Sequence, residues 1–280
     1  MLTRRKVTVV SALAAVAMFT GTAAAQDVLK VGLIIPLTGP FTSTGKQIEA
    51  AVRLYMAQHG TTVAGKKVEL IVRDDAGNAD QTKRIAQELA VNDKVSVLAG
   101  FGLTPLALAT APIATQAKIP QVVMAAGTSI ITERSPYITR TSFTVPQSCV
   151  IIADWAAKNN VKKVVTIVSD YAPGHDAEKS FKERFTAAGG QIVAEIRVPL
   201  ANPDFAPFLQ RAADAKPDAI FVFVPSGAGA ALMKQFVERG LDKAGMKLIG
   251  PGDITDDDIL NGMGDAALGV ITAHLYSANH

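Results

Sequence analysis

The chain has 280 residues, with 28 basic and 25 acidic side chains for a formal net charge of +3, and it contains one cysteine. A single cysteine cannot form an internal disulfide, so the fold must depend on an apolar core, and the length suffices for two domains. No run of basic residues with interleaved aromatic residues occurs, so the sequence gives no support for nucleic-acid binding.

The N-terminus predicts export. Basic residues at positions 4–6 precede an apolar run over 7–19, and three alanines end at Ala25 before Gln26. This pattern is typical of a secretory signal peptide, which we assign to residues 1–25, and its apolar run is too short to span a membrane. The arginine pair leaves the twin-arginine route open beside the general one. Cleavage after Ala25 leaves 255 residues, and it removes three cations, so the net charge of the mature chain is near zero (3 − 3 = 0). We expect this mature chain to be periplasmic.

The first half of the mature chain alternates strands and helices. Apolar, β-branched runs predict strands at 28–35, 67–73, 95–99 and 120–124, and helical periodicity begins at residues 46, 82 and 104. Almost continuously apolar strands indicate a parallel sheet that is buried on both faces. This half of the chain is therefore predicted to form one doubly wound α/β lobe.

Two segments of this lobe carry the chemistry. GFGLT and AAGTS follow consecutive parallel strands, so they meet at the carboxyl edge of the sheet, where open α/β sheets hold ligands. They offer free N–H groups and the hydroxyls of Thr104, Thr128 and Ser129, which suit an anionic or polar small group. The competing interpretation is that Thr104 only caps a helix with Pro105 at its first position and that AAGTS is an ordinary turn. GFGLTP also resembles half of a dinucleotide-binding fingerprint, but the third glycine of that motif is missing, so this interpretation is weak.

The second half of the chain repeats the alternation. It predicts helices at 148–158, 176–188, 205–215 and 227–239, and strands at 163–168, 191–198, 219–224 and 247–249. Two blocks of this kind, joined near residues 143–148, imply two doubly wound parallel-sheet lobes with a hinge and a ligand cleft between them. We place lobe one at 26–145, lobe two at 146–272 and a second crossing at 273–280.

The order of motifs resembles one family. VLKVGLIIPLTGPFTSTG, GKKVELIVRDDAGN, DKVSVLAGFGLT, PDFAPFLQRAADAKPDAIFV and LIGPGDITD are similar, in order and spacing, to the exported leucine/isoleucine/valine-binding type of periplasmic binding protein. The resemblance covers nearly the whole mature chain. It implies the type I fold of that family and the function of a solute receptor for an ABC importer, with a membrane permease and ATPase as partners and a monomeric receptor.

The resemblance also implies a binding site. In lobe one, Thr104 matches the hydroxyl that binds the ligand carboxylate, and further contacts are implied at Thr44, Ala125, Gly127 and Thr128. In lobe two, contacts are implied on three loops that follow strands, at Tyr171, His175, Ser226 and Asp253.

The sequence departs from the family pattern at the expected ammonium end of the solute. Members that bind aliphatic amino acids usually carry an aromatic residue at Thr44 and a threonine at Gly127. The later aromatic or acidic positions are Pro225 and Gly252, although Tyr171, His175 and Asp253 lie close enough to substitute. Two solutes therefore stay open: a branched-chain or other amino acid, or an aromatic or other organic acid without an amine.

The length is a second departure. Family members cross between the lobes three times, and this chain ends after the second expected crossing. We expect a fragment that leaves apolar surface on lobe one uncovered.

Two other classes of protein were weighed. A secreted α/β enzyme would need a nucleophile with a base, paired carboxylates or a metal cluster, and neither a GxSxG nor an HExxH motif occurs. Only His175, beside Tyr171 and Asp176, has a claim to catalysis, and ligand binding explains it equally well. The second class is a ligand-sensing regulator of the same fold. Such regulators usually work in the cytoplasm, so the predicted signal peptide argues against this class. We therefore predict no catalytic residue, no cofactor and no metal.

Overall fold

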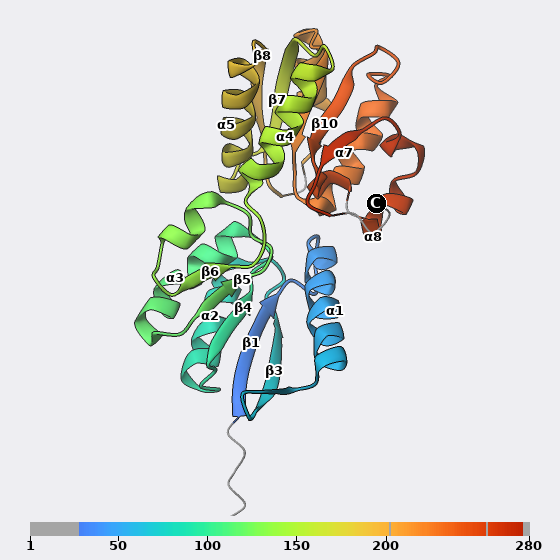
Figure 1. Cartoon of the computed structure of the whole chain (residues 1–280). Helices are drawn as coiled ribbons and strands as arrows, with labels where there is room; N and C mark the ends of the chain where they lie inside the picture. Colours follow the sequence, from blue (N-terminus) through green and yellow to red (C-terminus); the bar gives the residue numbers. More distant parts are fainter. Residues whose placement is uncertain (1–27, 202, 256, 277–280) are drawn as a thin grey trace, which may run out of the picture.

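The chain folds into two α/β lobes that lie one above the other (Figure 1). The computed structural model describes residues 28–201, 203–255 and 257–276. The predicted signal peptide and the end of the predicted second crossing lie outside these residues. No helix among the described residues is long and apolar enough to cross a membrane.

Lobe one is built on a six-stranded sheet of order β2-β3-β1-β4-β5-β6. All neighbouring strands are parallel except the short hairpin of β2 with β3. Its elements are β1 (Val28–Ile35), α1 (Thr42–His59), β2 (Thr62–Val63), β3 (Lys66–Asp74), α2 (Ala79–Val91), β4 (Val97–Gly100), α3 (Thr104–Ala117), β5 (Gln121–Val123), η1 (Ser129–Glu133) and β6 (Ile138–Arg140).

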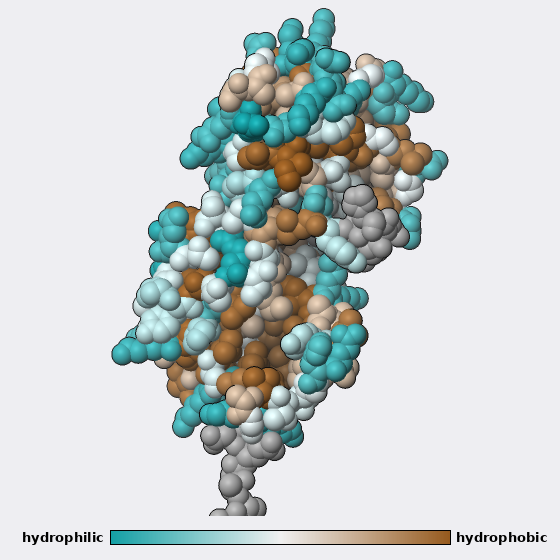
Figure 2. All heavy atoms as spheres, viewed as in Figure 1, coloured by the Kyte–Doolittle hydropathy of each residue, from teal (hydrophilic) through white to brown (hydrophobic). Residues whose placement is uncertain are grey.

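Helices cover both faces of this sheet. On one face α2 and α3 pack through Leu89 and Ala107 onto Ile34 and Leu98, all fully buried. On the other face Ile48 of α1 packs against buried side chains of β1 and β4. Figure 2 shows apolar surface on lobe one, and the strand side chains that are only partly buried beside α1 are Val31, Leu70, Val72, Val97 and Val122.

Lobe two repeats the architecture on a five-stranded sheet of order β11-β10-β9-β7-β8, parallel throughout. Its elements are α4 (Val145–Lys158), β7 (Lys163–Ser169), α5 (Ala172–Ala187), β8 (Gln191–Val198), α6 (Ala206–Asp214), β9 (Ala219–Phe223), α7 (Ser226–Glu238), β10 (Lys247–Pro251), η2 (Gly252–Thr255), α8 (Asp257–Met263), η3 (Gly264–Ala267) and β11 (Ile271–Ala273).

The core of lobe two is also divided between the two faces of its sheet. The face under α4 and α5 contains a stack of three phenylalanines, in which Phe181 lies between Phe185 (5.3 Å) and Phe221 (4.1 Å). Leu209 of α6 and Met233 of α7 pack on the other face against Ile220 and Val222. The predicted fold class, two doubly wound parallel-sheet lobes, is confirmed.

Several helices begin earlier than the sequence pattern predicts. The loop residues Thr42 and Ser43 already belong to α1, and α5 begins at Ala172 because Pro173 fits its first turn. The start of α4 is fixed by a capping box, in which Thr144 and Gln147 satisfy each other's main-chain N–H groups. These caps and prolines lie N-terminal to the first residues that show apolar periodicity, so the periodicity alone places the helix starts too late.

The predicted N-cap role of Thr104 is wrong. Leu103 is the N-cap of α3, and Thr104 and Pro105 occupy the first helical positions without any side-chain cap. The Thr104 hydroxyl bonds instead to the Thr128 hydroxyl of the neighbouring strand loop. Its polar atom is therefore directed to the carboxyl edge of the sheet.

The contacts between the lobes include two separate places in the described chain. Asp176, in the first turns of α5, accepts hydrogen bonds from the main-chain N–H (2.9 Å) and hydroxyl (2.8 Å) of Ser129 in lobe one. At the other contact, Gly227 of α7 lies so close to Pro40 that a Cβ there would collide with the Pro40 carbonyl oxygen. Residues of the two lobes are therefore in direct contact at both places.

Candidate ligand-binding site

A cavity of about 170 Å³ lies between the lobes. From lobe one it is lined by the segments that follow β1, β4 and β5, and from lobe two by those that follow β7, β9 and β10. In each sheet the chain order reverses beside the first strand, between β1 and β4 and between β7 and β9. Ligands of open α/β sheets bind at such switch points, and here two of them face one cavity.

The lobe-one wall is made of hydrogen-bond donors. Thr104 lines the cavity, and its hydroxyl oxygen lies 2.7 Å from that of Thr128, which is buried behind it. Within the part of the chain that the structure describes, the N–H of Ala126 donates to Phe101, whereas those of Ala125 and Gly127 donate to no other protein group. Around Thr104 this wall therefore presents a hydroxyl and free amides.

Arg140 braces the turn behind this wall. Its guanidinium donates to the carbonyl oxygens of Thr128 (2.8 Å) and Ser129 (3.3 Å). Burial lowers the pKa of Arg140, and the charge of Asp176 opposes that shift. Arg140 therefore fixes the orientation of the turn and adds positive charge on the side of the cavity that carries Thr104.

Four helices of the described chain begin at the cavity without a side-chain cap. Their N-cap residues all line it, and none makes a side-chain hydrogen bond to its own helix: Phe41 before α1, Leu103 before α3, Tyr171 before α5 and Pro225 before α7. Helix N-termini carry partial positive charge and unpaired N–H groups. The cavity is therefore electrostatically suited to an anion.

Among the described residues that line the cavity from lobe two, the acid is Asp253. The Oδ2 atom of Asp253 is shielded from solvent and has no hydrogen-bond partner among the described residues. Burial raises the pKa of the Asp253 carboxyl, and the nearby His274 opposes that shift. His274 packs directly on Gly252, where a Cβ would collide with the imidazole ring.

Aromatic side chains complete the lining. Phe41 and Phe143 come from lobe one and the first crossing, and Tyr171 and Phe223 come from lobe two. Phe143 also meets His274 edge to face, with ring centroids 5.6 Å apart, so the two crossings contact each other beside the cavity. Burial raises the pKa of Tyr171, with a further contribution from the charge of Asp253, so the phenol stays protonated.

The structure brings most of the predicted site residues together. Those that line the cavity are Thr44, Thr104, Ala125, Gly127, Tyr171 and Asp253. Thr128 stands behind Thr104, and the main chain of Ser226 begins α7 beside Pro225. His175 does not line the cavity, since it is exposed on α5 and its Nε2 pairs with Asp170 (2.7 Å).

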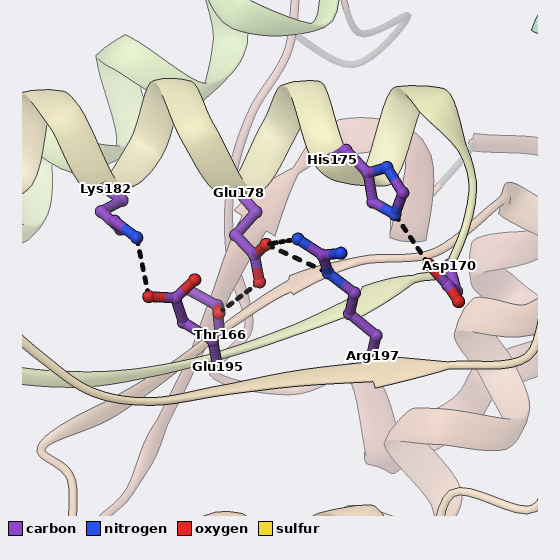
Figure 3. Close-up of polar contacts among 7 residues, drawn as sticks. All are labelled: Thr166, Asp170, His175, Glu178, Lys182, Glu195 and Arg197. Carbon is purple, nitrogen blue, oxygen red and sulfur yellow. Dashed lines mark hydrogen bonds and ion pairs between the residues drawn. The ribbon is translucent and has the colours of Figure 1, made fainter.

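His175 belongs to a row of polar side chains between α5 and the strands β7 and β8 (Figure 3). Its neighbours there are Glu178, which accepts hydrogen bonds from Thr166 (3.1 Å) and Arg197 (2.7 Å), and Lys182, which pairs with Glu195 (2.7 Å). These contacts join α5 to β7 and β8. They have a structural explanation that needs no ligand.

Sequence reasoning missed the lining residues that come from the crossings and the helix starts. Ser142, whose hydroxyl is buried without a partner, and Phe143 precede α4, Phe41 precedes α1, and His274 follows β11. The segment TSFTVP carried a signal, because a polar and aromatic stretch before a predicted helix marks a connection between the lobes. No described group of three or more His, Cys, Asp or Glu residues could hold a metal ion.

Comparisons with known proteins agree on the family of this site. A family model described as periplasmic binding protein matches residues 28–279. A Leu/Ile/Val-binding protein homolog 6 from Brucella abortus is 46% identical over 273 residues, which cover 96% of this chain and 70% of the relative.

Two solved structures from Rhodopseudomonas palustris are similar over most of this chain. A solute binding protein of an ABC transporter from strain BisB5, in complex with 3,4-dihydroxybenzoic acid, is 72% identical with a TM-score of 0.87, over 91% of this chain and 70% of that one. A second such protein, in complex with 4-hydroxybenzoate, is 43% identical with a TM-score of 0.85, and the match covers 87% of this chain and 67% of that one.

Proposed function

The chain belongs to the periplasmic binding protein family of ABC-transporter solute receptors, and from that premise we propose that it binds a single-ring aromatic carboxylate between its lobes. The observation that carries this proposal is the cavity lining. Phe41, Phe143, Tyr171 and Phe223 surround a space of about 170 Å³ whose lobe-one wall carries hydrogen-bond donors.

The size and shape of the cavity favour one ring. An apolar cavity of about 150 Å³ accommodates benzene, so the space here fits a ring with small substituents and is too small for a peptide or an oligosaccharide. Aromatic side chains bind a flat ring through edge and face contacts. A branched aliphatic side chain would fill this lining less completely.

The donors favour a carboxylate in a defined orientation. Thr104 and the free N–H groups of Ala125 and Gly127 form one wall, backed by Arg140. Asp253 lies on the opposite lobe, where it would repel a second negative charge. The carboxylate is therefore expected at Thr104, with the rest of the solute directed toward lobe two.

The ligands of similar proteins support the same class. The two Rhodopseudomonas palustris receptors hold 3,4-dihydroxybenzoic acid and 4-hydroxybenzoate. The second candidate solute is an amino acid, because the unpartnered Asp253 carboxylate could equally accept an ammonium group and a relative is named as a Leu/Ile/Val-binding homolog. The aromatic lining by Phe41, Phe143, Tyr171 and Phe223 favours the first candidate over an aliphatic amino acid.

Transport follows from closure of the lobes. A solute that contacts both lobes stabilises the closed state by the difference in its affinity for the two states. We expect the closed receptor, a periplasmic monomer released from its signal peptide after Ala25, to deliver the solute to a membrane permease and its ATPase. Binding of this kind needs no covalent chemistry.

A thermal-shift screen of the exported chain tests the solute class, since a ligand that binds only the folded state raises the melting temperature. The panel contains benzoate, 4-hydroxybenzoate, 3,4-dihydroxybenzoate, leucine, isoleucine and valine. We expect the hydroxybenzoates to raise the melting temperature in a concentration-dependent manner and the amino acids to leave it unchanged. Stabilisation by the amino acids alone would overturn the aromatic class.

A further inference from the structure

Asp253 is unusual among the described acids of this chain. It lines the cavity at the start of η2, and its Oδ2 is buried without a hydrogen-bond donor among the described residues. Buried carboxylates are normally paired, because an unsatisfied charge in a low-dielectric site is strongly unfavourable. The other buried acids follow this rule, since Asp75 accepts from Thr82 and Glu178 from Arg197.

The described side chains around Asp253 donate no hydrogen bond to its Oδ2. The ring of His274 packs against Gly252 but donates no hydrogen bond to Asp253 Oδ2. Tyr171, the other polar side chain of this wall, has its ring against Phe223, with centroids 6.3 Å apart. Because Asp253 lines the cavity and no described residue donates to its Oδ2, an occupant of the cavity is in position to supply the donor.

We propose that Asp253 is the specificity-determining residue of this site, and that it accepts a hydrogen bond from a ring hydroxyl of the solute. This inference rests on the proposed function, because a carboxylate bound at Thr104 directs the far side of the ring toward lobe two. The chain then selects hydroxylated benzoates over benzoate itself. The same hydrogen bond draws the lobes together, since its acceptor belongs to lobe two and the carboxylate donors belong to lobe one.

The size of the selectivity follows from the cost of a buried charge without a donor. A ligand without a hydroxyl displaces water from Asp253 and leaves the carboxylate unpaired, and sites of this kind reject the analogue that lacks the polar group. We expect 4-hydroxybenzoate to bind about 10- to 100-fold more tightly than benzoate. 4-Fluorobenzoate, which has nearly the same shape but no proton to donate, should resemble benzoate or bind more weakly.

Calorimetry with these three ligands tests the inference on the wild-type chain and on Asp253→Asn and Asp253→Ala. Removal of the carboxylate should reduce the preference for 4-hydroxybenzoate over benzoate to about threefold or less, while benzoate itself binds as well as before or better. Asp170→Asn is the matched control, because Asp170 is an exposed lobe-two acid outside the cavity lining. It should leave all affinities unchanged.

Each other outcome decides against one specific claim. An unchanged preference in both Asp253 variants overturns the assignment of Asp253 while leaving the aromatic class intact. If neither variant folds, the wild-type chain still decides, because equal affinities for 4-fluorobenzoate and 4-hydroxybenzoate would exclude a donated hydrogen bond. If none of the benzoates binds and leucine does, the proposed function itself fails.

Discussion

The hydroxyl oxygens of Thr104 and Thr128 lie 2.7 Å apart, although 24 residues separate them in the chain. One hydroxyl must donate its proton to the other, so one proton of the pair remains free for donation to a third group. With Thr104 at the cavity and Thr128 behind it, the arrangement in which Thr128 donates leaves the Thr104 proton for the solute. Hydrogen bonds in such a chain strengthen one another.

Thr104→Val should therefore weaken binding of 4-hydroxybenzoate by roughly 10- to 150-fold, because a hydrogen bond to a charged group contributes about 1.5–3 kcal/mol. Thr128→Val should weaken it less, because that residue orients Thr104 and does not line the cavity. Calorimetry measures both affinities, and unchanged melting temperatures show that the fold is intact. Equal affinity in wild type and Thr104→Val would remove Thr104 from the site.

Gly227→Ala should hinder closure of the lobes. A Cβ at this position would collide with the Pro40 carbonyl oxygen of lobe one, and main-chain atoms cannot easily move away. The closed state should lose stability relative to the open one, so we expect weaker binding and reduced ligand-induced compaction in small-angle scattering.

Gly262→Ala provides the control for this change. It also adds a methyl group to a helix of lobe two, but no atom lies within 4 Å of the added Cβ. It should bind and compact as wild type does. Full compaction of Gly227→Ala would show that the Pro40 contact does not limit closure.

Glu178→Ala should destabilise lobe two. The side chain of Glu178 is 4% exposed and accepts hydrogen bonds from both Thr166 and Arg197. Its removal leaves the buried Thr166 hydroxyl without this acceptor, which we expect to cost about 1–3 kcal/mol in the free energy of unfolding. Lys182→Ala, in the same polar row but with an exposed ion pair, should change stability little. Urea unfolding measures the free energy of unfolding of both variants. Equal losses would contradict the claim that the buried contacts of Glu178 stabilise lobe two more than the exposed ion pair of Lys182.

Asp253 should make the ligand-free chain less stable as pH rises. Burial raises the pKa of its carboxyl in the folded state, so the folded chain holds this proton more tightly than the unfolded chain, whose carboxyl titrates near pH ~3.9. Stability is then lost as pH rises from that value through the folded pKa. The stability advantage of Asp253→Asn over wild type should grow over this range in urea titrations. An advantage that is constant or shrinks with pH would contradict the assigned direction.

Much of the fold was predictable because its signals are local. The strand at Val28–Ile35 and the one at Gln191–Val198 were predicted at their observed bounds, since continuous apolar runs mark buried parallel strands. Helix starts were less predictable where a cap or a proline fixes them. The capping box of Thr144 and Gln147 extends α4 three residues beyond its apolar pattern.

The candidate site was predictable only in part. Thr104, Ala125 and Gly127 follow strands of one βαβ unit, so topology alone places them at one edge. Ser142 and His274 could not be found in this way, because they come from the crossings, whose path depends on how the lobes dock. His175 is not among the lining residues, and its imidazole pairs with Asp170 of the preceding loop, a contact that the pattern of family motifs does not reveal.

A crystal structure of the exported chain with 4-hydroxybenzoate tests the central claim most directly. We predict closed lobes with the solute in the cavity, its carboxylate about 3 Å from the Thr104 hydroxyl and its ring hydroxyl about 2.7 Å from an oxygen of Asp253. A carboxylate that faces Asp253, or a solute bound outside this cavity, would contradict the account.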